Sequence, residues 1–330
     1  MSQENPITAF MSDTAHTPRA LTIAGSDSSG GAGIQADLKA FARCGVHGMS
    51  AITAITAQNT LGVSAVHSIP TNIILAQVRA VVADIGVDAV KVGMLGNAEV
   101  VHAVALALEE LPPGTPVVVD PVMVAESGAQ LLDPDAQGAL VAEILPRATV
   151  LTPNLPEAYA LTRHAPRTTR ETVEDPLSTM RVTAGDGTST VSAPGLSSAP
   201  SPEEVGSEGE ADEDDVEARA LARALLTLGP KIVVLTGGHR AQAIDLFLDS
   251  AAPERIVSIP GERYSDGAAH GSGCTHSSVL AAQLALGRAP LQAAFAARAL
   301  TGAAVAGGLR DVGEGPGPVD VIGLVRLRPR

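Results

Sequence analysis

The apolar residues of this chain follow two alternating patterns. Short, nearly continuous apolar runs, typical of strands buried on both faces, are separated by stretches in which apolar residues recur at helical spacing. In the stretch 71–84, for example, Ile74, Val78, Val81 and Val82 fall on one side of a helix. The runs predict strands at ALTIAG (20–25), MSAITAIT (49–56), AVKVGM (89–94), PVVVD (116–120), ATVLT (148–152) and KIVVLTGG (231–238), and shorter ones near 243–248 and 255–259. Helices are predicted at about 31–44, 71–84, 98–110, 135–145, 216–228, 272–286 and 290–308.

This alternation predicts the fold class. Strands that alternate with helices of about 10–15 residues favour a parallel sheet covered by helices on both faces. We therefore expect an α/β three-layer sandwich with a central, mostly parallel sheet, formed by a single domain over residues 19–330 after a disordered tail at 1–18. The segment at about 163–215 is rich in Ser, Thr, Pro, Gly and acidic residues and almost lacks apolar periodicity. It cannot bury enough apolar surface to offset its ordering entropy, so we expect a disordered insertion rather than a second domain.

Charge and composition narrow the class of protein. The net charge is −14, and nine acidic residues with no basic one lie between Glu203 and Glu217, which leaves about −5 for the remainder. This balance argues against nucleic acid as a partner. No apolar run reaches the roughly 18 residues of a membrane span, and the first residues lack the pattern of a secretory signal. Because Cys44 and Cys274 are the only cysteines, no disulfide framework is expected, and we expect a soluble, cytoplasmic protein.

Glycines, acids and amides stand where the predicted strands end. In open parallel sheets, ligands bind at the carboxyl ends of the strands. One such residue alone is ordinary turn chemistry, but several sets along one edge indicate a ligand site. The sets are Gly25 and Asp27, Gln58 and Asn59, Gly93 and Met94, Asp120, Asn154 and Glu157, and Thr236 and Gly237.

The glycine-rich segment GSDSSGGAG (25–33) follows a strand and opens a helix, so its amides can cradle an anion or a polar ligand. It is neither a Rossmann nor a Walker loop. A GxGxxG spacing from Gly31 would need glycine where Ala36 stands, and Gly31 itself stands where the Walker lysine would be. A dinucleotide-dependent oxidoreductase is therefore disfavoured.

The segment HGSGCTHSS (270–278) carries the strongest signal. A glycine-rich turn runs directly into an apolar helix, so the amides of Gly271, Ser272, Gly273 and Cys274 face the space above the helix N-terminus. The helix dipole and unsatisfied N–H groups favour negative charge there, such as a transferring phosphoryl group. Cys274 lies in the first turn, where a thiol pKa is lowered, which makes it a candidate base. The alternative is a buried helix start with a small packing thiol.

Three residues supply candidate metal ligands. Asp120 closes the strand PVVVD, while Asn154 and Glu157 are one helical turn apart and project to one face. Phosphoryl transfer needs carboxylates that hold Mg²⁺ directly or through its water shell, so Asp120 and Glu157 are candidates. Asn154 and Glu157 also have the spacing of a helix N-cap with its matching N3 acid, a role that is compatible with a neighbouring site.

Taken together, these segments resemble the hydroxymethylpyrimidine/phosphomethylpyrimidine kinase family of thiamin biosynthesis, a branch of the ribokinase-like superfamily. The resemblance covers about residues 20–162 and 216–320 in the family's order. It implies a ribokinase-like fold, a homodimer, and phosphorylation of 4-amino-5-hydroxymethyl-2-methylpyrimidine and its monophosphate with ATP and Mg²⁺. The matching strings are LTIAGSDSSGGAGIQADLKAF (21–41), AITAQNTLGV (54–63), KVGMLG (91–96), VVDPVM (118–123), LTPNLPEA (151–158), TGGH (236–239) and HGSGCT (270–275).

The resemblance also implies roles position by position. Asp37 and Gln58 can offer acceptors and donors to the amino group and ring nitrogens of the pyrimidine, and Met94 and Val122 can pack on its ring. It implies Cys274 as the catalytic base beside an anion hole. The residues expected at the pyrimidine are Gly25, Ala32, Asp37, Gln58, Met94 and Val122. Those expected at the anion hole are Gly271, Ser272 and Gly273. The residues expected to bind ATP are Asn154, Thr236 and Gly237, and those expected to bind Mg²⁺ are Asp120 and Glu157.

Two departures from the family keep alternatives open. Many relatives carry lysine where this chain has Thr236, so a positive charge toward ATP is missing there or comes from another residue such as Arg240. The acidic insertion is the second departure, and we interpret it as a spacer rather than an interaction tail. A degenerate, non-catalytic pyrimidine-binding protein is one alternative, and a pyridoxal kinase of the same superfamily is another. The pair Gln58 and Asn59 favours the pyrimidine kinases.

Overall fold

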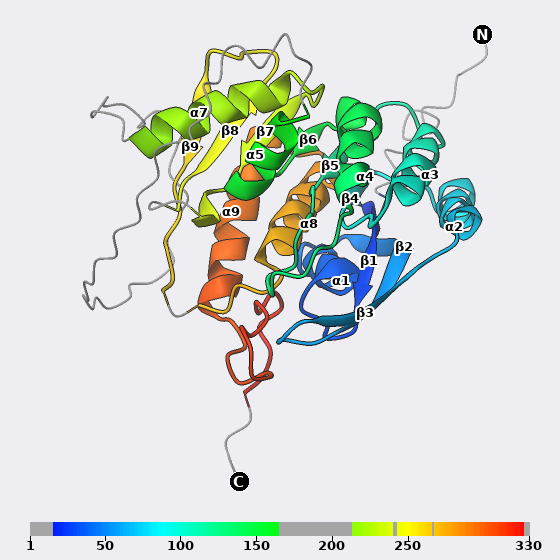
Figure 1. The fold of residues 1–330 in the computed structure, drawn as a ribbon, viewed down its shortest axis with the longest axis horizontal. Helices are drawn as coiled ribbons and strands as arrows, with labels where there is room; N and C mark the ends of the chain where they lie inside the picture. The colour runs from blue at the N-terminus through cyan, green and yellow to red at the C-terminus, as the bar shows by residue number, and fades with distance from the viewer. Residues whose placement is uncertain (1–15, 165–212, 240–242, 266, 327–330) are drawn as a thin grey trace, which may run out of the picture.

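The sheet at the centre of the molecule has nine strands in the order β3-β2-β1-β4-β5-β6-β7-β8-β9 (Figure 1). The structure is a computed structural model that describes residues 16–164, 213–239, 243–265 and 267–326. Helices cover the sheet on both faces, which confirms the predicted α/β sandwich. The strands are β1 (Arg19–Asp27), β2 (His47–Gln58), β3 (Val63–Ser68), β4 (Ala89–Val92), β5 (Val117–Val119), β6 (Val150–Leu151), β7 (Ile232–Leu235), β8 (Asp245–Asp249) and β9 (Ile256–Ile259).

The strands β2, β1, β4, β5, β6 and β7 pair in parallel, whereas β3, β8 and β9 join the two edges antiparallel. From β1 the chain proceeds outward to β2 and β3, and it then returns to β4 on the other side of β1. Connections that diverge in this way leave a crevice at the carboxyl ends of the two strands. The switch between β1 and β4 therefore marks where a ligand is expected.

The strand β3 was not expected from the sequence. Its residues beyond Val63 are all exposed, so it has no apolar run. It forms because β2 offers an edge to pair with, as in the register pair Thr56 and Val66. A pattern based on burial cannot predict a strand that buries neither face.

Two layers of helices flank the sheet. Alternate residues of a strand point to opposite faces, and in β1 Leu21 and Ile23 join one core while Ala20 joins the other. The first core packs α2, α3, α4, α5 and α7 against the sheet, and the second packs α1, α8 and α9. Among the described residues, no helix has the length and apolar character that a membrane crossing requires. The helices are α1 (Gly33–Arg43), α2 (Thr71–Asp84), α3 (Ala98–Glu109), α4 (Pro134–Ala139), α5 (Leu155–Thr162), α7 (Glu213–Leu226), α8 (Ser272–Ala285) and α9 (Pro290–Ala306).

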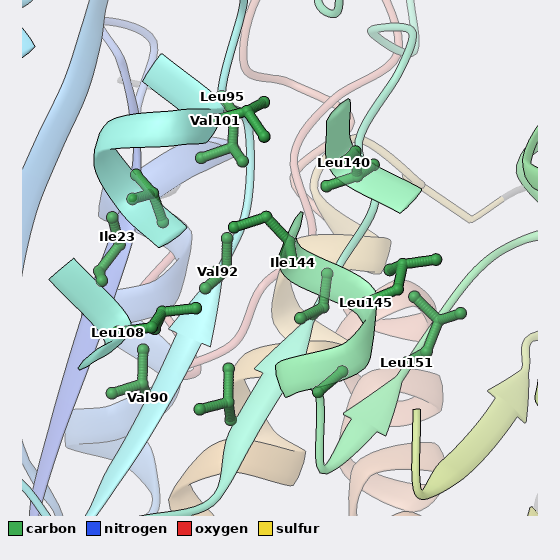
Figure 2. Packing of buried hydrophobic residues seen from close by; sticks show 14 of the residues in the cluster. Ile23, Val90, Val92, Leu95, Val101, Leu108, Leu140, Ile144, Leu145 and Leu151 are labelled. Carbon is green, nitrogen blue, oxygen red and sulfur yellow. The ribbon is translucent and has the colours of Figure 1, made fainter. Parts of the chain in front are cut away.

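The strand β4 shows how the faces are divided. Figure 2 shows Val90 and Val92 on the side of the sheet that carries Val101 and Leu108 of α3. Because side chains alternate along a strand, Lys91 between the two valines points to the opposite face, toward α1 and α8. A lysine thus lies inside the second helical layer, a place where the apolar pattern of β4 indicates no charge.

The helix predicted over 135–145 is less regular than expected. The structure has α4 at Pro134–Ala139, then a π-helical turn at Leu140–Ile144 and a 3₁₀ turn at Leu145–Arg147. Pro146 explains the end, because proline has no N–H to donate to the preceding turn and its ring crowds that turn.

Most of the expected insertion, and most of the tail, lies outside the described residues. At the insertion's C-terminal boundary the structure differs from the expectation, because α7 begins at Glu213 rather than after 215. Acidic residues in a first helical turn interact favourably with the positive end of the helix dipole. The acidic run therefore continues into the first turn of a regular helix.

Candidate active site

The predicted strand-end residues lie along one edge of the sheet. The parallel register puts the carboxyl ends of β2, β1, β4, β5, β6 and β7 next to one another, in that order. Gln58, Gly25, Met94, Asp120, Asn154 and Thr236 follow the same order along this edge. The helix α8 packs on β1, β4 and β5 and so brings its N-terminus to the middle of the edge.

The first glycine turn (25–33) is organised around Asp27. This buried carboxylate accepts hydrogen bonds from Ser29 Oγ and from the backbone N–H of Ala32, each at 2.8 Å, and lies 3.2 Å from Nε2 of His270. Burial works against its charge, but these partners prevail and hold the pKa of Asp27 down at about 2. Asp27 is therefore a buried anion that fixes the shape of the turn. The Ala32 N–H is already engaged by its carboxylate.

The second glycine turn (270–274) packs directly on the first. Gly271 has φ +82°, and a Cβ there would lie 1.8 Å from the Gly31 carbonyl oxygen. A Cβ on Gly31 would in turn lie 2.2 Å from Cδ2 of His270. Only glycine fits both positions, because one needs a left-handed backbone and both need the space. The two turns thus form one site although they are far apart in the sequence.

The helix α8 begins at Ser272, so the N–H groups of Gly273 and Cys274 have no acceptor within the helix. The Ser272 N–H already donates to the Ala269 carbonyl at 2.9 Å. Of the amides that the sequence offered to an anion, that of Ser272 is therefore already engaged, and those of Gly273 and Cys274 remain available at the helix start.

Four of the residues expected at the pyrimidine lie near the carboxyl ends of β1, β2, β4 and β5. Gly25 leaves room for Met94, since a Cβ would approach its Sδ to 2.9 Å. Gln58 Oε1 accepts a hydrogen bond from Thr56 Oγ1 at 3.1 Å, which leaves the amide nitrogen for another partner. Val122 is half-buried just beyond β5. Gln58 and His270 also line a small cavity of about 10 Å³, together with Asn59, Thr60, Glu126, Ser127 and Pro316.

Asp37 has a different position from the one expected. Its side chain has 0% exposure, and its carboxylate lies 3.0 Å from Lys91 Nζ. It also accepts hydrogen bonds from Thr22 Oγ1 and Ser278 Oγ, each at 2.6 Å. Both carboxylate oxygens are therefore engaged inside the protein, so Asp37 has no oxygen turned toward a pyrimidine. The cause is its place on the face of α1 that packs on the sheet and α8, which residue type alone does not reveal.

Asp120 and Glu157 are buried acids whose charges are unfavourable to each other. Burial raises the pKa of Asp120, against the opposing effect of Lys91. Burial, followed by the charge of Asp120, raises the pKa of Glu157 to about 8. Asn154 and Glu157 form the predicted capping box, with both reciprocal hydrogen bonds at 2.9 Å.

These two acids fit a magnesium ion. A divalent cation would relieve the unfavourable charges of Asp120 and Glu157, and carboxylate oxygens are ligands that Mg²⁺ prefers. In the part of the chain that the structure describes, no group of three or more His, Cys, Asp or Glu side chains could hold a metal ion. Such a pair suits Mg²⁺ that keeps several waters and binds substrate phosphates.

Cys274 departs from its expected electrostatics. The pKa of its thiol is raised to about 12, mainly by burial and in part by the charges of Asp120 and Asp37. Lys91 and a hydrogen bond from the Gly33 backbone lower it, but they do not outweigh the other effects. The expectation of a lowered thiol pKa at the helix N-terminus is therefore wrong, because burial of the thiol, aided by two nearby carboxylates, outweighs the effect of the helix end.

The end of the edge where ATP is expected is built around Asp245. The Gly237 N–H donates to Asp245 Oδ1 at 2.8 Å, and His276 Nε2 lies 3.1 Å from Oδ2. Thr236 Oγ1 donates to the Pro153 carbonyl at 3.3 Å. Arg240, considered as a replacement for the missing lysine, lies outside the described residues.

Sequence reasoning missed three parts of the site. Lys91 belongs to the string KVGMLG but received no role, and the Lys-x-Gly spacing is the available signal, because Gly93 clears space for the lysine. His270 belongs to the string HGSGCT but received no role, and it is buried and bound to Asp27. The segment at 315–320 also received no role, yet the Val319 N–H donates to the His270 carbonyl at 3.1 Å.

An α/β sandwich with an amide-lined helix start, two buried acids and a switch point between β1 and β4 defines a class of phosphotransferases that act on small molecules. Solved structures agree. The pyridoxal kinase of Staphylococcus aureus in complex with ADP has a TM-score of 0.71 and 28% identity, covering 94% of both chains. The phosphomethylpyrimidine kinase of Clostridium difficile has a TM-score of 0.61 and 35% identity, covering 85% of this chain and 96% of that one.

The sequence comparisons identify the family. The phosphomethylpyrimidine kinase family model matches residues 27–186 and 203–320. The hydroxymethylpyrimidine/phosphomethylpyrimidine kinase of Rhizobium meliloti is 42% identical over 92% of this chain and 96% of its own length. The enzyme of the same name from Haemophilus influenzae is 40% identical over 95% of this chain and 100% of its own length. The chain belongs to the hydroxymethylpyrimidine/phosphomethylpyrimidine kinase family and is a kinase, as the resemblance implied.

Proposed function

We propose that this chain transfers the γ-phosphoryl group of ATP to 4-amino-5-hydroxymethyl-2-methylpyrimidine and then to its monophosphate, in thiamin biosynthesis. The observation that carries the proposal is the packing of the two glycine turns, in which Gly271 abuts the Gly31 carbonyl. This contact sets the amides at the start of α8 beside the turn where the pyrimidine is expected. An acceptor alcohol and a phosphoryl group can then meet in one place.

The transfer is an in-line displacement. The hydroxyl oxygen of the pyrimidine attacks the γ-phosphorus, the bond from that phosphorus to the bridging oxygen breaks, and ADP leaves. The Gly273 and Cys274 N–H groups stabilise the charge on the moving phosphoryl group. Mg²⁺, held by Asp120 and Glu157, would supply positive charge at the β- and γ-phosphates when bound.

The hydroxyl proton has two possible destinations. A thiol with a pKa of about 12 is protonated at neutral pH, so Cys274 can accept the proton only after losing its own. The proton otherwise passes to an oxygen of the transferred phosphoryl group, and the thiol then only positions the alcohol. Product formation by Cys274→Ser and Cys274→Ala separates these roles. A base is lost in both variants, whereas a positioning side chain is largely replaced by serine.

The central test is mass analysis of the products formed from hydroxymethylpyrimidine, ATP and MgCl₂. We expect the monophosphate first and the diphosphate later, with Asp120→Asn forming neither at a comparable rate. Absence of both products from the folded wild-type chain would refute the proposal.

Phosphorylation of pyridoxal is a second candidate. The pyridoxal kinase of Bacillus subtilis in an ADP complex is 32% identical with a TM-score of 0.70, so this fold also serves pyridoxal. Parallel assays with both alcohols decide between them. We expect higher kcat/KM for the pyrimidine, because the Gln58 amide nitrogen can donate to one of its two ring nitrogens, whereas pyridoxal has a single ring nitrogen. Faster turnover of pyridoxal would reverse the assignment.

We further propose that the chain is a cytoplasmic protein and a homodimer. Light scattering of the purified chain would test the homodimer.

A further inference from the structure

Polar side chains form a row on the face of the sheet that α8 covers. Val118 of β5 lies in the core beneath α8, and Asp120, two residues further, points the same way. Thr22 of β1 and Lys91 of β4 are register partners, so they lie side by side on this face. Thr22 and Lys91 are both 0% exposed. Such groups are tolerated in an apolar layer only when they are paired.

Lys91 is the centre of this row. Its Nζ lies 3.0 and 3.1 Å from the two carboxylate oxygens of Asp37 and 3.8 Å from Oδ2 of Asp120. A Cβ on Gly93 would approach Nζ to 2.7 Å, so the glycine two residues along the strand keeps the ammonium's space open. The lysine is therefore held by α1 on one side and reaches the site acid of β5 on the other.

Asp120 is fixed from two directions. Ser277 of α8 donates to its Oδ2 at 3.0 Å, and Lys91 approaches the same oxygen from the sheet. The same ammonium thus faces the site acid that lies beneath the start of α8.

The charges around Lys91 do not cancel. One ammonium stands between the carboxylates of Asp37 and Asp120, and removing one partner of a buried ion pair leaves an uncompensated charge. Lys91 therefore supplies the positive charge that faces both carboxylates at this place.

We propose that Lys91 is a positioning residue of the phosphoryl-transfer site: anchored by Asp37, its ammonium holds the carboxylate of Asp120 in place beneath the start of α8. This inference rests on the proposed function, because it assigns a role in that reaction. It differs from a purely structural role, in which Lys91 would serve only to neutralise Asp37.

Paired substitutions separate the two roles. Lys91→Met keeps the unbranched side chain and removes the charge, which leaves Asp37 and Asp120 without their counter-charge and should lower Tm. Adding Asp37→Asn removes one of the two carboxylates and restores the balance, so Tm should recover in the double variant. Lys231→Met is the matched control, since Lys231 is exposed at the start of β7.

The kinetics of the double variant decide the question. We expect its kcat for hydroxymethylpyrimidine to stay roughly a hundredfold or more below wild type, with the KM of the pyrimidine little changed, as for loss of a preorganised electrostatic group. Recovery of kcat together with Tm would overturn the inference, as would a raised KM with unchanged kcat. Failure of the wild-type chain to phosphorylate the pyrimidine would instead refute the proposed function.

A measurement on the unmodified chain covers the case in which the variants fail to fold. The chain has three lysines, Lys39, Lys91 and Lys231, so a ¹⁵N-lysine spectrum has three side-chain signals. Hydroxymethylpyrimidine, β,γ-methylene-ATP and MgCl₂ should shift the Lys91 Nζ signal and leave Lys231 unmoved, with Lys231→Met and Lys39→Met giving the assignments. A Lys91 signal that stays in place on saturation would overturn the inference.

Discussion

Nε2 of His270 lies 3.2 Å from Oδ2 of Asp27, across 243 residues of chain. This contact joins the two glycine turns, because Asp27 also accepts the N–H of Ala32 at the start of α1, while His270 immediately precedes Gly271. One buried polar pair therefore fixes the position of the two halves of the site relative to each other. The geometry of the phosphoryl site depends on an interaction that lies outside the reacting groups.

Asp27→Asn tests this pair through the pH dependence of stability. The native pKa of about 2 lies below the ordinary 3.8, so ionised Asp27 contributes stability that is complete above about pH 4 and is lost as the pH falls through 2. The difference corresponds to about 2 kcal/mol. Urea unfolding should show the variant less stable by about that amount at pH 7, with the gap closing toward pH 2. A gap that stays constant with pH would contradict the prediction.

Gly271→Ala should abolish most activity without comparable loss of fold. A methyl group would collide with the Gly31 carbonyl and push the two glycine turns apart. Gly287, at the other end of α8, is the matched control: it has φ +75°, and a Cβ added there would meet no atom within 4 Å. Both variants should lose about 1–3 kcal/mol from backbone strain, measured by urea unfolding. Only Gly271→Ala should lose kcat, and equal kcat in the two would show that the contact between the turns is dispensable.

Glu157→Gln should alter the effect of Mg²⁺ on stability. The pKa of Glu157 is raised to about 8, so the folded chain retains a proton that the unfolded chain releases near the ordinary 4.5. Wild-type stability should therefore fall as the pH rises from about 4.5 to 8, and the variant should lack this decline. Thermal unfolding with and without MgCl₂ should show stabilisation of wild type that grows with pH and is reduced in the variant. An identical effect of MgCl₂ on the wild-type chain and on Glu157→Gln would show that Glu157 does not bind Mg²⁺.

The Cys274 thiol should react slowly at neutral pH. With a pKa of about 12 against the ordinary 9.0, its thiolate fraction is about a thousandfold lower than that of an unperturbed cysteine. The greater nucleophilicity of a more basic thiolate offsets part of this, so alkylation by iodoacetamide should be roughly fiftyfold slower than for a free thiol. Mass spectrometry of the Cys44→Ser variant measures Cys274 alone. Rapid alkylation at pH 7 would show that the thiol pKa is not raised.

The sandwich and the edge where the site lies could be predicted from the residues alone. Continuous apolar runs located the parallel strands, and the glycines and acids that follow them, such as Gly25 and Asp120, marked their carboxyl ends. These features are local, because a buried strand and a turn each require particular residue types at consecutive positions. The helix start predicted at about residue 272 agrees with the start of α8 at Ser272 for the same reason.

Which polar groups face one another was settled by packing across the whole molecule. That packing turned Asp37 away from the expected pyrimidine contacts and onto Lys91, and it raised the thiol pKa of Cys274 where the helix N-terminus alone would lower it. It also formed β3, whose exposed residues carry no apolar signal. The physical reason is that burial and charge interactions depend on distances across the sheet and between helices, and residues far apart in the sequence set these distances.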